Sequence, residues 1–212
     1  MRLGVAFEAF VPVSRWGPLF QVLRLEHPEL ELDWQPASFP SRNRSLLETA
    51  DVGLFIQPPA EPGLSALTIE SSEMLVMMAV GHPLAQHPGV SVADILDQPF
   101  PGGPDLHPDW VAFWTLDECR GGPPRFTGAP VENAAQWLDA IASARAIGTV
   151  PAWLADSLPH PGVVALPLRG APTVETRLVW RAENPNPMVR ALVDLAAEMT
   201  SNSRDDSSAA VG

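Results

Sequence analysis

The N-terminal part of the chain alternates between two periodicities, and this alternation constrains the fold more than any other feature. Short apolar or alternating runs are typical of strands, and apolar residues spaced three and four apart are typical of helices. The runs that predict strands are Arg2 to Phe7, Leu30 to Trp34 and Asp51 to Ile56, and those that predict helices are Arg15 to His27 and Ser45 to Thr49.

This strand–helix–strand–helix–strand order predicts an α/β fold that opens with parallel strands and crossover helices. Sheets of this kind bind ligands outside the carboxyl ends of their strands. The first such end in this chain is the loop from Phe7 to Ser14, so we expect this loop to lie at a binding site.

The rest of the chain predicts two small α/β lobes rather than one continuous sheet. A strand from Leu64 to Glu70 and an apolar strand from Met74 to Val80 are separated near Ser71, and the chain is expected to return near Gly170. The last strand and the last helix then complete the first lobe. The expected division is residues 1–71 plus 174–200 for subdomain I, 72–173 for subdomain II, and 201–212 for a disordered tail.

Charge and composition exclude several classes of function. The net charge is −12 and the sequence contains no Lys, so the chain lacks the clustered cations that bind nucleic acid or an anionic membrane surface. Its single cysteine, Cys119, fits a reducing compartment, and neither a signal peptide nor a run long enough to cross a bilayer is visible. We therefore expect a cytoplasmic protein.

No arrangement of residues predicts an enzyme. The five histidines do not cluster with Cys or carboxylates at the spacing of metal ligands, and no nucleotide-binding or nucleophile motif follows a strand. We expect no catalytic residues, no metal and no other cofactor.

Several short motifs, taken in order, resemble one family. They are the opening strand from Arg2 to Phe7, the helix stop and strand from Pro28 to Leu32, the strand from Asp51 to Leu54, the turn from Gly81 to Ala85, the strand and turn from Ala146 to Pro151, and the returning strand from Leu178 to Arg181. Together they resemble the effector-binding domain of LysR-type transcriptional regulators over roughly Met1 to Met199.

The resemblance implies a type 2 periplasmic-binding-protein-like fold, in which two Rossmann-like subdomains are joined by two crossover strands. It implies that a small metabolite binds in the cleft between the lobes and shifts a population of domain arrangements. The alternative with the same fold is a solute-binding protein of a transporter.

The resemblance also implies partners. A homodimer is expected, with the helix from Arg15 to His27 against the helix from Glu132 to Arg145 of a second copy, and a tetramer is expected for the full-length protein. DNA binding is implied only through an N-terminal helix-turn-helix, which does not precede Met1. We expect a domain separated from that segment, with a natural stand-alone sensor as the alternative.

Candidate effector contacts lie in loops that follow strands and at helix N-termini, whose free N–H groups attract carboxylates. The first loop is unusually apolar before Ser14, so the expected effector is a carboxylate or a weakly polar molecule. The candidates are Ser14, Ser38, Phe39, Ser41 and Gln57 in the first lobe, and Gly102, Gly103, Thr127, Asn133, Val150 and Pro151 in the second.

Overall fold

The computed structural model describes residues 1–8, 12–36, 46–58, 60–102, 108–128 and 131–209. The chain forms two compact units: unit 1 comprises the two segments Met1–Ser71 and Glu175–Gly212, and unit 2 comprises the single segment Ser72–Val174. No helix in the described part of the chain has the length and apolar character needed to span a bilayer.

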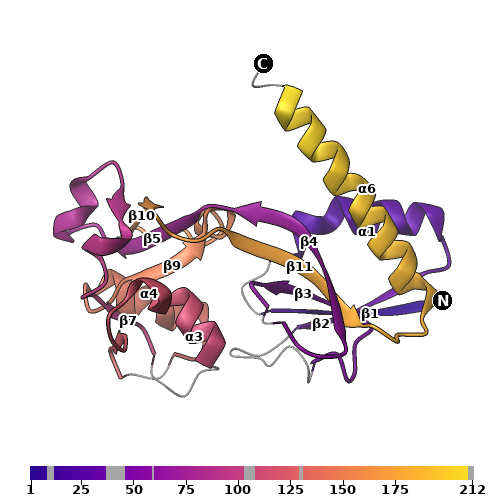
Figure 1. Ribbon diagram of the computed structural model, residues 1–212, viewed down its shortest axis with the longest axis horizontal. Helices are drawn as coiled ribbons and strands as arrows, with labels where there is room; N and C mark the ends of the chain where they lie inside the picture. Colours follow the sequence, from indigo (N-terminus) through magenta and orange to yellow (C-terminus); the bar gives the residue numbers. More distant parts are fainter. Residues whose placement is uncertain (9–11, 37–45, 59, 103–107, 129–130, 210–212) are drawn as a thin grey trace. The chain divides into compact units, whose positions relative to one another are not determined.

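Unit 1 is built on a five-stranded sheet in the order β2-β1-β3-β11-β4 (Figure 1). β2 and β3 both run parallel to β1, as the alternating sequence predicts, whereas β11 is antiparallel to β3. The parallel strands therefore end at one edge of the sheet, and β11 begins there. The strands are β1 (Arg2–Phe7), β2 (Glu31–Pro36), β3 (Val52–Ile56), β4 (Leu64–Ser72) and β11 (Val174–Arg181).

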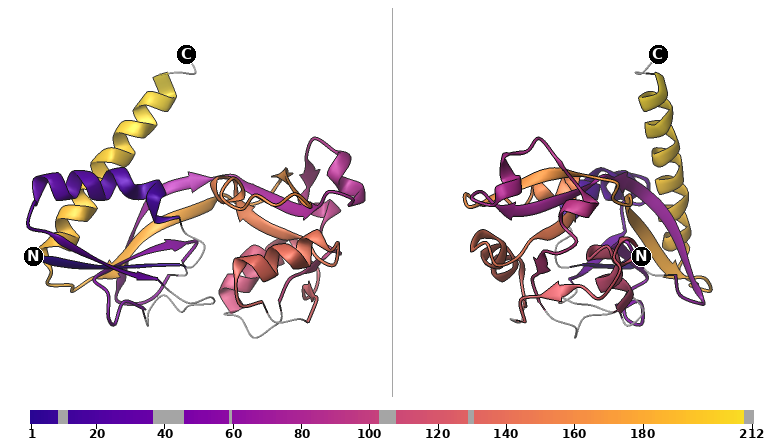
Figure 2. Two further views of the ribbon diagram at one scale, coloured as in Figure 1. Left: turned by 180° about the vertical axis from the view of Figure 1, so that it is seen from behind. Right: turned by 60° about the vertical axis from the view of Figure 1, so that its left-hand side comes forward.

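Both faces of this sheet bury apolar side chains. α1 (Gly17–Glu26) and α6 (Pro187–Ala209) pack against each other, and the Phe20 ring of α1 meets the Trp34 ring of β2 edge-on at 4.8 Å between centroids. Figures 1 and 2 show the two helices on the same side of the sheet. On the other face, a separate cluster consists of Ala6, Leu47, Ala50, Phe55 and Val179.

The helix expected from Arg15 to His27 begins later in the structure, and Ser14, the residue in the position of its N-cap, does not cap it. A 3₁₀ turn, η1 (Val13–Trp16), precedes α1, and Ser14 makes no capping hydrogen bond. The turn satisfies its own donors, because the Arg15 N–H donates to the Pro12 carbonyl at 2.9 Å. Pro18 then occupies the first turn of α1, where a residue without an N–H costs nothing.

Unit 2 contains a four-stranded sheet in the order β6-β10-β5-β9 and a two-stranded parallel pair, β7-β8. α4 packs on β5 and β10, α5 on β5, and α3 on β9. The strands are β5 (Met74–Ala79), β6 (Val90–Ser91), β7 (Pro99–Phe100), β8 (Arg125–Phe126), β9 (Gly148–Pro151) and β10 (Val163–Arg169), and the helices are α3 (Pro108–Trp114), α4 (Ala134–Ala142) and α5 (Ala152–Ala155).

Local chemistry explains where the helical segments of unit 2 begin. The Asn133 side chain accepts a hydrogen bond from the Gln136 N–H at 3.0 Å and caps α4. The Asp94 carboxylate accepts both the N–H and the hydroxyl of Ser91, at 2.8 and 2.7 Å, which fixes the 3₁₀ turn η3 (Val92–Asp94) and lowers the Asp94 pKa. The short 3₁₀ turns η2 (Pro83–Gln86) and η4 (Asp117–Cys119) complete the unit.

The last helix is longer than the sequence predicts and enters the segment over residues 201–212 that is expected to be a disordered tail. α6 (Pro187–Ala209) continues to Ala209. No Gly or Pro lies between Met188 and Val211 to stop the helix, and the hydroxyls of Thr200 and Ser201 donate to carbonyls four residues earlier, as helical side chains do.

Candidate functional site

Unit 1 gathers polar groups at the edge where β1 and β3 end and β11 begins. Glu8 follows β1, Gln57 follows β3, and Glu175 is the second residue of β11. This edge is formed by the carboxyl ends of parallel strands, which is where open α/β sheets bind ligands. Of these three residues, the sequence predicted only Gln57 as a site residue.

The Glu8 carboxyl group ends the pairing of β1 with β3. The Glu8 N–H donates to the Leu54 carbonyl at 3.4 Å, and the Ile56 N–H donates to the Glu8 Oε2 at 3.3 Å. The side chain therefore accepts a hydrogen bond where the next backbone carbonyl of a longer strand would lie. Burial of this carboxyl group raises its pKa to about 8, against the smaller opposite effect of the Ile56 hydrogen bond.

Gln57 is held in an uncommon backbone conformation by Glu175. Its φ is 48°, in the left-handed region that residues other than Gly rarely adopt. The Gln57 N–H donates to the Glu175 carbonyl at 2.7 Å, and the Gln57 Oε1 accepts the Glu175 N–H at 3.0 Å. Two hydrogen bonds thus fix the residue at the end of β3, as expected of a position whose geometry matters.

The Glu175 side chain extends this network along the edge. Its carboxylate forms an ion pair with Arg177, with 2.7 Å between Oε2 and the Arg177 Nε, and accepts the Thr68 hydroxyl at 3.4 Å. Glu175 of β11 therefore links Gln57, which follows β3, to Thr68 of β4. The carboxylate and the guanidinium neutralise each other, so this pair adds no net charge to the edge.

Unit 2 has a comparable edge where the parallel strands β7 and β8 end. The Thr127 N–H donates to the Phe100 carbonyl at 3.0 Å, and the Gly128 N–H donates to the Gly102 carbonyl at 3.1 Å. Gly102 has a φ of 97°, which a side chain would not tolerate. The Thr127 Oγ1 is buried and has no hydrogen-bond partner among the described residues. A buried hydroxyl of this kind is available to a ligand.

The remaining predicted residues of unit 2 have structural partners. Asn133 is exposed and caps α4, while Val150 and Pro151 are buried in β9 and pair with Leu75 and Met74 of β5. The structure brings Gly102 and Thr127 together but connects neither of them to these three residues through a hydrogen bond in the described part of the chain. Their roles in binding stay predictions.

The other predicted residues of unit 1 are less informative. Ser14 is exposed within η1 and its side chain caps no helix. Ser38, Phe39 and Ser41 lie outside the described residues, as does Gly103 of unit 2.

Sequence reasoning missed Glu8 and Glu175 as members of the edge. Glu8 had a usable signal, because it is the first charged residue after an apolar strand. Glu175 had none, since its place beside Gln57 comes from pairing between strands that are more than a hundred residues apart in the sequence. Within the described residues, no three His, Cys, Asp or Glu side chains form a group that could hold a metal ion.

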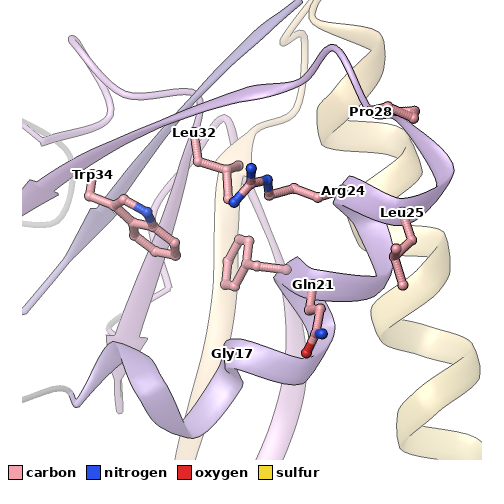
Figure 3. Close-up of a pocket in the computed structure, with 8 residues that line it drawn as sticks. Gly17, Gln21, Arg24, Leu25, Pro28, Leu32 and Trp34 are labelled. Atoms are coloured by element: carbon pink, nitrogen blue, oxygen red, sulfur yellow. The ribbon is translucent and has the colours of Figure 1, made fainter.

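A second surface of unit 1 is a groove between α1 and β2, shown in Figure 3. Its volume is about 470 Å³. Leu25 is 72% exposed and Trp34 is 37% exposed, so large apolar side chains meet solvent here beside the Arg24 guanidinium. The groove is lined by Gly17, Phe20, Gln21, Arg24, Leu25, Pro28, Leu32 and Trp34.

Comparison of the sequence with protein families gives one match. The model of the LysR substrate binding domain matches residues 1–201, which is almost the whole chain. No curated protein sequence matches the chain.

Solved structures share the fold at low sequence identity. Full-length CbnR in complex with its target DNA is 19% identical, with a TM-score of 0.71, over 94% of this chain and 70% of that one. The BenM effector binding domain with its effector benzoate is 16% identical, with a TM-score of 0.72, over 95% and 93%. The reduced OxyR regulatory domain from Pseudomonas aeruginosa is 19% identical, with a TM-score of 0.69, over 92% and 96%.

Proposed function

Because this chain belongs to the LysR substrate binding domain family, we propose that it is the effector-sensing and oligomerisation domain of a LysR-type transcription regulator. The family match over residues 1–201 is the observation that carries this proposal. The fold is the type 2 periplasmic-binding-protein-like fold, and the family consists of transcription regulators, which favours this function over transport of a solute. Such a regulator acts on DNA, so we place it in the cytoplasm.

The effector that we propose is a small molecule, and the candidate contacts lie on the polar edge of each unit taken by itself. BenM binds benzoate through a domain of the same fold, which supports a small organic ligand here. We assign Gln57 in unit 1 and the pair of Gly102 and Thr127 in unit 2 as contacts, because each lies where parallel strands end. Ser14, Asn133, Val150 and Pro151 stay secondary candidates.

A thermal-shift screen of the intact chain against small metabolites tests the proposal. A ligand that binds only the folded state raises the unfolding midpoint, and titration calorimetry then gives its affinity. Thr127→Val keeps the size of the side chain and removes the hydroxyl, so we expect it to weaken binding about tenfold or more.

Thr173→Val is the matched control, since Thr173 is exposed in the turn before β11. The control is expected to bind as tightly as the wild type. A screen in which no small molecule stabilises the chain contradicts effector sensing, and equal affinities for the two threonine variants contradict the assignment of Thr127.

We further propose that the groove of unit 1 binds α4 of a second copy. Solvent-exposed apolar groups such as Leu25 and Trp34 mark interaction surfaces when they lie together. The exposed face of α4 carries the small residue Ala135 and the acidic residue Asp139, which complement an apolar groove with Arg24 at its rim.

Sedimentation of the intact chain tests this interface. Leu25→Asp places a charge in the groove and is expected to shift the chain towards monomer. Val80→Asp is the matched control, because Val80 is an apolar residue of unit 2 with 50% exposure and lies outside the groove. A wild-type chain that stays monomeric at high concentration, or equal behaviour of the two variants, contradicts the interface.

A further inference from the structure

Two strands carry the chain between the units, and we call β4 and β11 the connecting strands. The first segment of unit 1 ends at Ser71, within β4, and the second segment begins at Glu175, within β11. The two strands are hydrogen-bonded neighbours in the sheet of unit 1 (Figure 1). The chain therefore leaves and re-enters unit 1 through neighbouring strands, and the contacts that hold these strands near Ser71 and Glu175 lie at the unit boundary.

Glu175 ties the start of β11 to Gln57 of the binding edge. Its carbonyl accepts the Gln57 N–H at 2.7 Å, and its N–H donates to the Gln57 Oε1 at 3.0 Å. Its carboxylate accepts the Thr68 hydroxyl of β4 at 3.4 Å and is paired with Arg177. Glu175 thus contacts the binding edge through its backbone and β4 through its side chain.

Glu70 makes a second tie, from β4 to the loop that follows β1. The Arg15 Nε donates to the Glu70 Oε2 at 2.8 Å and to Oε1 at 3.1 Å, and the Arg15 Nη2 also donates to Oε1. Arg15 belongs to η1 and directly follows the candidate contact Ser14. Glu70 directly precedes Ser71, so this tie also lies at the unit boundary.

We propose that Glu70 and Glu175 are positioning residues, through which the state of the binding edge of unit 1 reaches the connecting strands. Each carboxylate lies where the chain passes between the units, and each residue is tied to a segment that carries a candidate effector contact. The Glu70 and Glu175 side chains are 21% and 30% exposed, so their ion pairs are screened less than pairs at the open surface. The proposal deepens the proposed function and rests on it, because it assigns how an occupied edge is communicated.

The contacts form a continuous path from the edge to β4. A ligand that orders Gln57 also orders Glu175, because the two residues share two hydrogen bonds, and Thr68 follows through the Glu175 carboxylate. No hydrogen bond joins Gln57 to Thr68 directly within the described part of the chain. An effect of Gln57 on β4 that needs the carboxylate therefore demonstrates coupling through Glu175, and the coupling acts equally in both directions.

Hydrogen–deuterium exchange of the intact chain tests this coupling without a ligand. Gln57→Ala removes the hydrogen bond from the Glu175 N–H and changes no residue of β4. We expect the amides of β4 and of residues 174–177 to exchange about fivefold faster, as the loss of one hydrogen bond allows. Gln57→Gly loses the same bond without the left-handed strain and is expected to act in the same way. The amides of α4 in unit 2 are the internal reference and are expected to keep their rates.

A Glu175→Ala background separates the carboxylate from the backbone. This change keeps the backbone groups that bond to Gln57 and removes the acceptor of the Thr68 hydroxyl. In this background Gln57→Ala is expected to leave the exchange of β4 unchanged, because the path through the carboxylate is already absent. A merely structural role of Glu175 would let the two substitutions act independently.

Glu70→Gln tests the second tie from the opposite end. The variant loses the charge that pairs with Arg15, so we expect the amides of η1 to exchange about fivefold faster. Glu48→Gln removes the same charge from an exposed position of unit 1 and is the matched control, which is expected to exchange at the wild-type rates.

Three results overturn the proposal: Gln57→Ala leaves β4 at its wild-type rates, Gln57→Ala accelerates β4 equally with and without the Glu175 carboxylate, or Glu70→Gln leaves η1 unchanged. None of these results depends on a ligand, so the proposed function is still decided by the thermal-shift screen. If the screen finds no ligand while the expected exchange rates are observed, effector sensing fails and the coupling of the edge to the connecting strands stands.

Discussion

At the scale of single residues, the binding edge of unit 1 holds two residues in states that are unusual for their residue type. The Glu8 carboxyl group is partly buried with a raised pKa, and Gln57 has a left-handed backbone. Each state costs free energy of folding, and each lies where strands end. Such costs persist at positions where the geometry serves binding.

The pKa of Glu8 predicts how stability changes with pH. An unfolded Glu loses its proton near its ordinary pKa, whereas folded Glu8 keeps it until about pH 8, so between these values the folded state binds more protons. The free energy of unfolding therefore falls as pH rises, by at most about 1.4 kcal/mol per pH unit from this group.

Glu8→Gln removes this dependence. We expect denaturant unfolding to show that the variant is more stable than the wild type at pH 8 and close to it at about pH 3.5, where Glu8 is mostly protonated in both states. Glu48→Gln should follow the wild-type curve. Parallel pH profiles for the wild type and Glu8→Gln contradict the raised pKa of this carboxyl group.

Two substitutions of Gln57 separate the free-energy cost of its left-handed backbone from the stabilisation by its side-chain hydrogen bond. Gln57→Ala loses the hydrogen bond to the Glu175 N–H and keeps the left-handed strain, so we expect a loss of about 1 kcal/mol in the free energy of unfolding. Gln57→Gly loses the same bond but relieves the strain, and should be more stable than the alanine variant by about 1 kcal/mol. Urea unfolding of both variants measures the difference, and a glycine variant less stable than alanine contradicts the strain.

At the scale of elements, periodicity predicted the long helices and the core strands, while short elements depended on tertiary partners. α1, α4 and α6 follow the apolar spacing that the sequence displays, and α4 also follows its capping residue Asn133. β7 (Pro99–Phe100) is a short strand within a stretch that resembles a loop, and it exists because β8 lies parallel to it. Two-residue strands carry no periodicity that a sequence pattern can show.

The close contact between α4 and β9 predicts how adding a methyl group at Gly148 changes stability. A Cβ added at Gly148 would overlap the Trp137 ring of α4, whereas one added at Gly121 meets nothing within 4 Å. Gly148→Ala is expected to destabilise the chain by about 1–3 kcal/mol, and Gly121→Ala by much less. Thermal unfolding of the two variants compares them, and similar midpoints would refute close packing at β9.

At the scale of the whole molecule, the chain combines a binding edge in each unit with an apolar groove on unit 1. The proposed dimer uses the groove, and the proposed ligand uses the edges. Because the groove and the edge of unit 1 are formed by different residues, variants of one should leave the other intact. This separation makes oligomerisation and sensing independently measurable.

A charge exchange tests which surface occupies the groove. Arg24→Asp should weaken a dimer in which Arg24 meets Asp139 of the second copy, and the added change Asp139→Arg should restore part of the loss. Analytical ultracentrifugation measures the dissociation constants of both single variants and the double variant. Additive effects would show that these two residues do not meet.

The sequence by itself determined the family, the opening parallel strands and the existence of the strong helices, because these depend on local spacing and on Pro, Asn and apolar patterns. It also placed Gln57 at the end of a strand, and it named Gly102 and Thr127 as candidates in the second lobe. Only the tertiary structure decided that Glu175 fixes Gln57, that the Thr127 hydroxyl is buried without a partner among the described residues, and that the Glu8 carboxyl group accepts the Ile56 N–H at the end of β3. These facts arise from pairing between distant segments, and burial and pairing depend on neighbours that local sequence does not specify.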